Sequence, residues 1–506
     1  MSSRLAAAIM AVLAIAIGLF ELHEARDGLR VVSTDVGRTP ITIFQPLATA
    51  PVPVVLIAHG FAGSQQLMQP FAETLARSGY IAVTFDFLGH GRNPVPMRGD
   101  ISEGNAITSE LLRELGEVSA YARTLPESDS RMAVLGHSMA SDIVIRFAQA
   151  NPDIAATVAV SVFSPVVTAT SPRNLLVIVG ALEPSMLRDE GLRIVDLAAD
   201  GQAVAGETYG RFADGSARRL VLARGVEHIG VLFSRDSLTE SLQWMNAAFG
   251  RSQLGFTDSR GRWLALLFLG IVALAWPLSA LLPLVSETSA GASLPWKRLL
   301  IAAIVPAFLT PMILWKMPTD FLPILLGDYL ALHFLLYGVL TAALLLVWRH
   351  RTEGGFPAAT ARKNLAVAAV LTGAYNIGAF GLPIDTYLFS FMPIPARLPL
   401  MAAIACGTLP YFIADEWLTR GAQARPGAYA LTKICFLLSL ATAVALNPMK
   451  LFFLIIIVPA ILLLFLAFGL ISRWSYRATH HPLPGALANA AVFAWAIAVT
   501  FPMIVR

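Results

Sequence analysis

The second half of the chain, from residue 263 onward, is a series of long apolar runs separated by short polar segments. A helix needs about 20 apolar residues to cross a bilayer, because each residue advances the helix by only about 1.5 Å. Eight runs approach this length, at residues 263–285, 299–315, 328–348, 365–382, 398–418, 428–446, 451–471 and 486–505. The pattern therefore predicts an all-α polytopic membrane domain.

Residues 5–22 form a further apolar run behind Arg4, and two interpretations of this run compete. One is a cleavable signal peptide, and the other is an uncleaved transmembrane anchor. The run is longer than a typical signal-peptide core, and the sequence ELHEA at 21–25 lacks the small residues of a cleavage site. We favour the anchor, which brings the predicted number of spans to nine.

The intervening residues alternate polar and apolar segments, as a soluble domain does. Over the whole chain 56% of residues are hydrophobic and only 14% are charged, whereas soluble proteins carry about a quarter charged residues. The deficit lies in the apolar runs. We therefore predict three parts, which are an N-terminal transmembrane anchor at 1–22, a soluble domain at 23–262 and a membrane domain of about eight helices at 263–506.

Lys and Arg are distributed unevenly between the two sides of this predicted topology, and cytoplasmic loops are normally the basic ones. If Met1 is cytoplasmic, the cytoplasmic set has eleven members, Lys297, Arg298, Arg349, Arg351, Arg362, Lys363, Arg420, Arg425, Lys433, Arg473 and Arg477. The opposite set has four, Lys316, Arg397, Lys450 and Arg506. The soluble domain is therefore predicted outside the cytoplasm, which in a bacterium would be the periplasmic face of the inner membrane.

The net charge of +4 does not indicate a nucleic-acid partner, because the basic residues are spread over the membrane loops and form no patch with aromatic residues. The two cysteines, Cys406 and Cys435, lie in predicted membrane helices, so the soluble domain has no disulfide framework. No pattern of metal ligands or of a cofactor site is found. The predicted partners are the lipid bilayer and a substrate.

Short runs rich in β-branched residues recur through the soluble part, at 53–58, 81–85, 132–135, 156–162, 175–179 and 220–223. A helical pattern with apolar residues three and four positions apart occupies 108–125. Alternating strands and helices predict a mostly parallel sheet covered by helices on both faces.

Five motifs follow the strands in a fixed order, HGFAGS at 59–64, DFLGHG at 86–91, GHSMA at 136–140, GALE at 180–183 and GVEH at 225–228. In this order they resemble the α/β-hydrolase superfamily of esterases and lipases, over residues 30–250. The resemblance implies an α/β hydrolase fold and a serine hydrolase that uses a Ser-acid-His triad and no cofactor.

The resemblance assigns a role to three side chains. Ser138 corresponds to the nucleophile at a sharp strand-to-helix turn, with Ala140 in place of the usual second glycine. The alternative for Ser138 is a simple helix N-cap. Glu183 corresponds to the triad acid, although Asp is more usual there and Asp189 is the second candidate. His228, after the last strand, corresponds to the general base.

Backbone N–H groups of Phe61 and Met139 correspond to the oxyanion hole of the family. His59 and His90 lie in motifs with structural roles in this fold, and Asp86, Gly89 and Gly91 are interpreted as loop-shaping residues. Residues 163–174 are too few to form the helical lid that many lipases carry.

A carboxylic-ester hydrolase that acts on apolar or lipid-like esters is the first functional hypothesis. An acyltransferase that uses the same acyl-enzyme is the second, and a transporter or receptor with a non-catalytic ligand-binding domain is the third. Several polar residues lie within the predicted spans, and a structural role is favoured for them; they are Asp328, Tyr329, His333, Tyr375, Asn376, Asp415 and Glu416.

Overall fold

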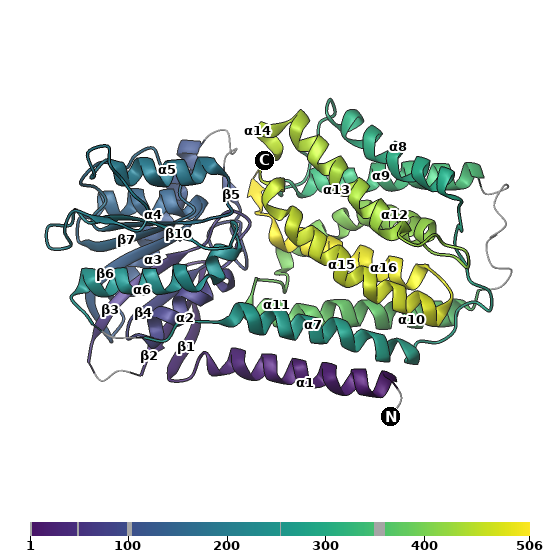
Figure 1. Ribbon diagram of the computed structural model, residues 1–506, viewed down its shortest axis with the longest axis horizontal. Helices are drawn as coiled ribbons and strands as arrows, with labels where there is room; N and C mark the ends of the chain where they lie inside the picture. Colours follow the sequence, from purple (N-terminus) through teal and green to yellow (C-terminus); the bar gives the residue numbers. More distant parts are fainter. Residues whose placement is uncertain (1–2, 48–49, 99–103, 253–254, 349–359, 506) are drawn as a thin grey trace. The chain divides into compact units, whose positions relative to one another are not determined.

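The computed structural model describes the whole chain except residues 1–2, 48–49, 99–103, 253–254, 349–359 and 506, and the chain forms two compact units (Figure 1). The helical unit comprises Met1–Ala16, Leu266–Pro383 and Met392–Phe501. The second unit comprises Ile17–Ala265, Ile384–Phe391 and Pro502–Arg506. Two short segments from the apolar half of the sequence thus belong to the same unit as Ile17–Ala265.

A nine-stranded sheet with the order β1-β2-β4-β3-β6-β7-β8-β10-β9 forms the centre of the second unit. Its strands are β1 (Leu29–Val36), β2 (Thr39–Pro46), β3 (Val52–Ala58), β4 (Ile81–Phe85), β6 (Ser128–His137), β7 (Ile154–Val160), β8 (Leu175–Gly180), β9 (Thr208–Tyr209) and β10 (Arg218–Ala223). The strands from β4 to β10 in this order are parallel, whereas β2 pairs antiparallel with β4 and β9 antiparallel with β10. The predicted mostly parallel sheet is confirmed.

Helices cover both faces of this sheet, as predicted. They are α2 (Gln69–Arg77), α3 (Gly104–Arg123), α4 (Met139–Ala150), α5 (Ser185–Asp196) and α6 (Arg235–Phe249). Apolar residues of α2 and α6 pack against one face, and those of α4 and α5 pack against the other. Because β3 is covered on both sides, all seven of its residues are buried, which explains why a continuous apolar run rather than an alternating one predicted this strand.

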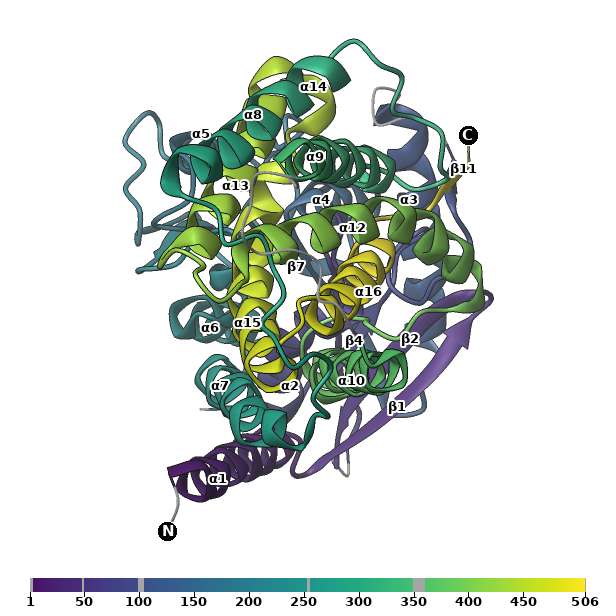
Figure 2. The same cartoon turned by 90° about the vertical axis from the view of Figure 1, so that its right-hand side faces the viewer.

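The hairpin of β1 and β2 at one edge of the sheet was not among the predicted strands (Figure 2). Its two strands pair from Leu29 with Pro46 to Val36 with Thr39, and Gly37 turns the chain with a φ of 61°. β1 is at least partly exposed along its whole length, and polar residues interrupt its apolar ones. An edge strand of this kind lacks the apolar run by which the other strands were recognised.

Nine helices in the described part of the chain are long and apolar enough to cross a membrane, which agrees with the predicted number. They cover Ser3–Glu24, Arg260–Leu281, Trp296–Leu314, Gly327–Trp348, Arg362–Tyr387, Pro395–Thr419, Ala428–Leu446, Leu454–Thr479 and Leu483–Thr500. The α-helical parts are α1 (Ser3–Glu24), α7 (Arg260–Leu278), α8 (Trp296–Leu314), α9 (Gly327–Trp348), α10 (Arg362–Ala374), α11 (Phe380–Tyr387), α12 (Leu398–Thr419), α13 (Ala428–Leu446), α15 (Leu454–Thr479) and α16 (Leu483–Thr500), with a short α14 at Pro448–Leu451.

Helix α12 packs against both α9 and α16 within the helical unit (Figure 2). The fifth apolar helix is longer than its predicted core of residues 365–382, because α10 continues through a π-helical turn at Tyr375–Ala379 into α11. A π turn widens a helix without ending it. The helix therefore continues to Tyr387, and its last residues belong to the sheet-containing unit.

Candidate active site

Ser138 lies between the end of β6 and the start of α4, with a φ of 54° and a ψ of −119°. This strained conformation is the sharp strand-to-helix turn that the sequence predicted. A Cβ atom added at Gly136 would lie 2.4 Å from the backbone oxygen of Ala140, so the turn requires a glycine there. The Ser138 side chain makes no capping hydrogen bond to α4. Ser138 therefore occupies the N-cap position of α4, but its side chain does not cap the helix.

His228 lies beyond β10 and directs its ring at Ser138. Its Nε2 atom is 3.0 Å from Ser138 Oγ. The preceding loop passes close to the end of β8, since a Cβ atom at Gly180 would lie 2.6 Å from the carbonyl oxygen of Val226. The Glu227 carboxylate accepts hydrogen bonds from the backbone N–H groups of Ile229 and Gly230, both at 2.8 Å. These contacts fix the backbone on both sides of His228.

Glu183 is buried directly after β8, and its Oε1 atom is 3.6 Å from His228 Nδ1. This separation is longer than a hydrogen bond, although catalytic hydrogen bonds are often loose without substrate. The second candidate acid, Asp189, lies exposed on α5. The structure therefore brings Ser138, His228 and Glu183 together and leaves Asp189 in solvent.

Ser161 was not identified from the sequence, yet it contacts the candidate acid. Its hydroxyl donates a hydrogen bond to Glu183 Oε1 at 2.5 Å, and its backbone N–H donates to the carbonyl of Ile178 at 2.7 Å. Ser161 therefore holds the carboxylate that faces His228. The only available signal in the sequence was its position directly after the strand that precedes β8.

His137, the residue before Ser138, was also not identified. Its Nε2–H donates a hydrogen bond to the backbone carbonyl of His228 at 3.0 Å, and the two rings lie 4.9 Å apart. Burial, and next the neighbouring His228, hold the pKa of His137 well below its usual range. A neutral His137 can therefore support the His228 backbone without adding a second positive charge to the site.

The loop of residues 59–64 passes directly beside Ser138. A Cβ atom at Gly60 would lie 2.9 Å from Ser138 Cβ, so only glycine allows this approach. Phe61 follows at once, and Met139 is the first residue of α4. Phe61 and Met139, predicted to supply the oxyanion hole, thus each follow one member of the close pair Gly60 and Ser138.

His59 connects this loop to the loop that follows β4. Its Nδ1–H donates to the carbonyl of Gly60 at 2.8 Å, and its Nε2 accepts from the backbone N–H of Phe87 at 3.1 Å. Burial lowers the pKa of His59, opposed in part by Asp86, which favours the neutral ring that these two bonds require. This geometry agrees with the structural role predicted for His59.

Asp86, Gly89 and Gly91, interpreted as loop-shaping residues, each occupy a position whose local geometry favours that residue type. Asp86 accepts backbone hydrogen bonds from Gln65 at 2.8 Å and from Arg92 at 2.9 Å. A Cβ atom at Gly91 would lie 2.4 Å from the Asp86 carboxylate, and one at Gly89 would lie 2.4 Å from the backbone oxygen of Met503. Strand β11 (Ile504–Val505) pairs beside this point with β5 (Met97–Arg98).

Large apolar side chains lie exposed beyond the carboxyl ends of β7 and β8, at the sheet edge that carries Ser138. Phe163, Leu182 and Met186 are 56%, 67% and 50% exposed. The segment between β7 and β8 contains neither a helix nor a strand, in agreement with the prediction that it holds no helical lid.

The polar residues predicted within the apolar helices have partners inside the helical unit. Asp328 accepts backbone hydrogen bonds from Tyr329 at 2.8 Å and Phe321 at 3.1 Å, and His333 lies 3.1 Å from the Ser439 hydroxyl. Tyr375 donates to the carbonyl of Ile271 at 2.6 Å, and Asn376 to Asn489 at 3.4 Å. Two buried ion pairs complete the set, Asp415 with Lys433 and Glu416 with Arg420. These contacts favour the structural role predicted for them. No group of three His, Cys, Asp or Glu side chains placed to hold a metal ion occurs among the described residues.

Comparison with known proteins identifies relatives of part of the chain. Residues 49–189 match a family model described as serine aminopeptidase, S33. Cutinase 1 and cutinase 2 of Thermobifida cellulosilytica are 26% and 28% identical over 117 residues, which are 23% of this chain and 42% of each cutinase. The chain therefore matches less than half the length of these curated relatives. A solved structure assigned as a dienelactone hydrolase, from Klebsiella pneumoniae, is 17% identical and covers 45% of this chain and 100% of its own, with a TM-score of 0.34.

Proposed function

We propose that this α/β hydrolase is a membrane-embedded serine ester hydrolase in which Ser138, His228 and Glu183 form the catalytic triad. The observation that carries the proposal is the 3.0 Å contact of His228 Nε2 with the hydroxyl of Ser138, at a turn where the Ser138 backbone is strained. A serine hydroxyl is a weak nucleophile near neutral pH, and an adjacent imidazole activates it.

In the proposed reaction, His228 takes the hydroxyl proton as Ser138 Oγ attacks the ester carbonyl carbon. Glu183 stabilises the imidazolium that forms. Backbone N–H groups of Phe61 and Met139 bind the developing oxyanion, each contributing about 3 kcal/mol to lowering the barrier. His228 then protonates the leaving alcohol, and water activated by His228 hydrolyses the acyl-enzyme.

Two observations support an apolar ester as the substrate. Phe163, Leu182 and Met186 expose large apolar side chains after β7 and β8, whose carboxyl ends lie at the same sheet edge as that of β6, and the named relatives include cutinases. Burial of an acyl chain against these side chains would contribute up to about 0.8 kcal/mol for each CH₂ group. Acyl transfer to an alcohol by the same acyl-enzyme is the alternative reaction.

An ester series with full-length protein in detergent tests this proposal. We expect hydrolysis of p-nitrophenyl esters with a kcat/KM that rises up to about fourfold for each added CH₂ group. Added alcohols should yield little transesterified product. Amino-acid p-nitroanilides serve as the comparison, because the family model describes an aminopeptidase. Faster cleavage of these amides would contradict an esterase, and dominant ester exchange would identify an acyltransferase.

The proposed location is a bilayer, with the anchor at 1–22, the hydrolase domain at 23–262 and about eight spans beyond. The nine apolar helices support it, because they expose large apolar side chains such as Leu269, Val370 and Leu463, each at least 66% exposed. Surfaces of this kind normally face lipid or a partner. If the hydrolase domain follows the first of nine spans, the chain reaches the same side of the bilayer again after the fifth and the ninth spans. Ile384–Phe391 and Pro502–Arg506, at the ends of these two spans, belong to the same unit as the hydrolase domain.

The proposed orientation places the hydrolase domain outside the cytoplasm, in the periplasm if the host is a bacterium. Three of the counted basic residues are buried with partners, namely Arg397, Arg420 and Lys433. Without them the bias is nine to three. Arg349, Arg351 and Arg506 lie outside the described residues.

Single cysteines test this orientation after both native cysteines have been replaced by alanine. Ala213→Cys in the hydrolase domain and Met449→Cys, at a position that is 94% exposed between α13 and α15, should react with an impermeant maleimide on intact spheroplasts. Ala422→Cys, between α12 and α13, should react only after permeabilisation. The reverse labelling pattern would invert the topology.

A further inference from the structure

The segment Ile384–Phe391 comes from the apolar half of the sequence, yet it belongs to the sheet-containing unit. It comprises the end of α11 and the residues that follow. Its partners in that unit include Ser64 at the end of the loop of residues 59–64, Gln66 just after that loop, and Arg92 in the loop beyond β4. A distant part of the chain therefore contacts the surroundings of the candidate oxyanion hole.

Ser390 makes the most direct of these contacts. Its backbone N–H donates to Ser64 Oγ at 2.9 Å, and its hydroxyl donates to Gln66 Oε1 at 2.7 Å. Ser64 is the last residue of the loop that begins at His59. The side chains of Ser64, Gln66 and Ser390 are at most 5% exposed, so water cannot readily replace either hydrogen bond. The loss of one of these bonds therefore leaves a buried polar group unpaired.

Asp385, in the same segment, bonds Gln66, just after the 59–64 loop, and Arg92. Its carboxylate accepts a hydrogen bond from Arg92 at 2.5 Å, and its backbone carbonyl accepts one from Gln66 Nε2 at 3.2 Å. The backbone N–H of Arg92 in turn donates to Asp86, which also accepts from the backbone N–H of Gln65. Gln65 and Gln66, the two residues after Ser64, are thus both held by hydrogen bonds.

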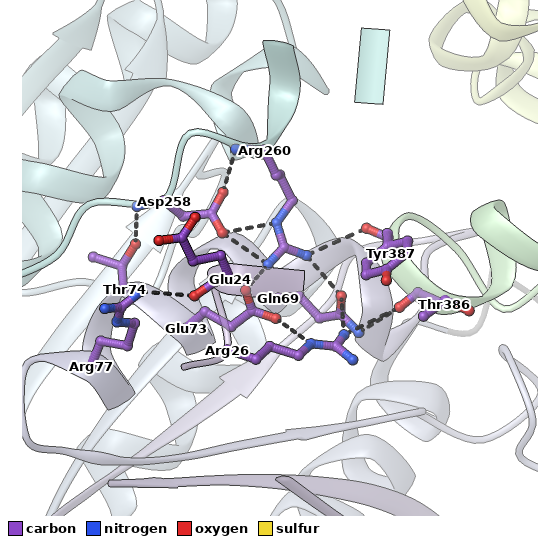
Figure 3. Close-up of polar contacts among 10 residues, drawn as sticks. All are labelled: Glu24, Arg26, Gln69, Glu73, Thr74, Arg77, Asp258, Arg260, Thr386 and Tyr387. Carbon is purple, nitrogen blue, oxygen red and sulfur yellow. Dashed lines mark hydrogen bonds and ion pairs between the residues drawn. The ribbon is translucent and has the colours of Figure 1, made fainter. Parts of the chain in front are cut away.

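The other side of the segment is held by a buried ionic network (Figure 3). The carbonyl of Thr386 accepts from Gln69 Nε2 at 3.1 Å, and that of Tyr387 accepts from Arg260 at 3.4 Å. Arg260 is itself paired with Glu73 and with Asp258, and all three side chains are at most 1% exposed. This network therefore fixes the backbone of Thr386 and Tyr387, next to the residues that contact the loop.

The loop of residues 59–64 needs support at both ends. It contains Gly60 and Gly63, which are conformationally permissive, and Ala62, whose φ of 53° is unfavourable for a residue with a Cβ atom. His59 secures the beginning of the loop through Gly60 and Phe87. The hydrogen bond from Ser390 secures its end at Ser64.

We propose that residues 385–391 are a positioning element that holds the 59–64 loop so that the Phe61 N–H points at the substrate carbonyl oxygen beside Ser138. This proposal rests on the proposed serine-hydrolase function. Oxyanion stabilisation depends on donors that are already in place before reaction. The segment therefore acts on the transition state through the loop, without itself touching substrate.

Two variants of the full-length protein test the proposal, singly and together. Ser64→Ala removes the hydroxyl that accepts from the Ser390 N–H, and Ser390→Ala keeps that N–H but removes the hydroxyl that bonds Gln66 beside the loop. Each single variant is expected to lower kcat about tenfold, less than the 10²–10³-fold loss on removal of a whole oxyanion donor, with KM nearly unchanged. The Ki of a trifluoromethyl ketone, which forms an oxyanion on Ser138, should rise by the same factor as kcat/KM falls. The double variant should lose less than the product of the two single losses, because both residues act on one loop.

Ser78→Ala is the matched control, since Ser78 is as buried as Ser390 and its hydroxyl donates to the carbonyl of Thr74 at the end of α2. It should lower thermal stability but leave kcat and Ki unchanged, whereas Ser390→Thr should restore both. If a serine-to-alanine variant does not fold, Asp385→Asn takes its place in the same measurements. Unchanged kcat and Ki in the loop variants, with labelling still dependent on Ser138, would overturn the positioning role alone. Labelling that persists without Ser138 would overturn the proposed function itself.

Discussion

Ser138→Ala is expected to abolish labelling by a fluorophosphonate and to lower kcat for ester hydrolysis by about 10⁶-fold, as loss of a serine nucleophile does in other triad enzymes. Alanine removes Ser138 Oγ, which lies 3.0 Å from His228 Nε2, and is expected to leave the β6–α4 turn intact. The measurements are gel fluorescence after labelling and steady-state turnover of a p-nitrophenyl ester.

Ser119→Ala is a suitable control for this experiment. Ser119 is a buried serine on α3 whose hydroxyl bonds to Met132 Sδ at 3.2 Å, away from the candidate site. Labelling and turnover of this variant should match those of the native chain. Persistent labelling of the Ser138 variant would show that another residue is the nucleophile.

Glu183→Gln is expected to lower kcat by about 10³–10⁴-fold while the protein stays folded, by analogy with acid-to-amide changes in other triads. The amide oxygen can still accept the hydrogen bond from Ser161. The neutral side chain cannot stabilise the imidazolium of His228, and its NH₂ group favours the wrong tautomer of the ring. Turnover is measured together with near-UV circular dichroism, which reports on tertiary packing.

Asp189→Asn provides the comparison, because Asp189 was the second candidate acid and lies exposed on α5. Its kcat should stay within about twofold of the native value, as expected for a surface substitution away from the site. A large loss for Asp189→Asn with little loss for Glu183→Gln would transfer the role of the acid to Asp189.

The sequence alone was sufficient for features that depend on local pattern. Nine apolar helices follow from run length, because a span must satisfy its own backbone hydrogen bonds within one continuous segment. The central strands follow from apolar runs buried on both faces. The sharp turn at Ser138 follows from a motif whose small residues, such as Gly136, are needed within that turn. The physics behind each of these features acts between residues close together in the chain.

Features that depend on partners far along the chain were decided only by the tertiary structure. Ser161 bonds to Glu183 because β7 and β8 end side by side, and nothing around Ser161 in the sequence indicates this partner. Gly89 is needed because Met503 approaches it, and Ser64 is held by Ser390 across 326 positions of sequence. One hydrogen bond of a serine hydroxyl or a backbone N–H leaves no periodicity and no compositional bias. Its partner is selected only when the packing of the whole unit brings the two groups within about 3 Å.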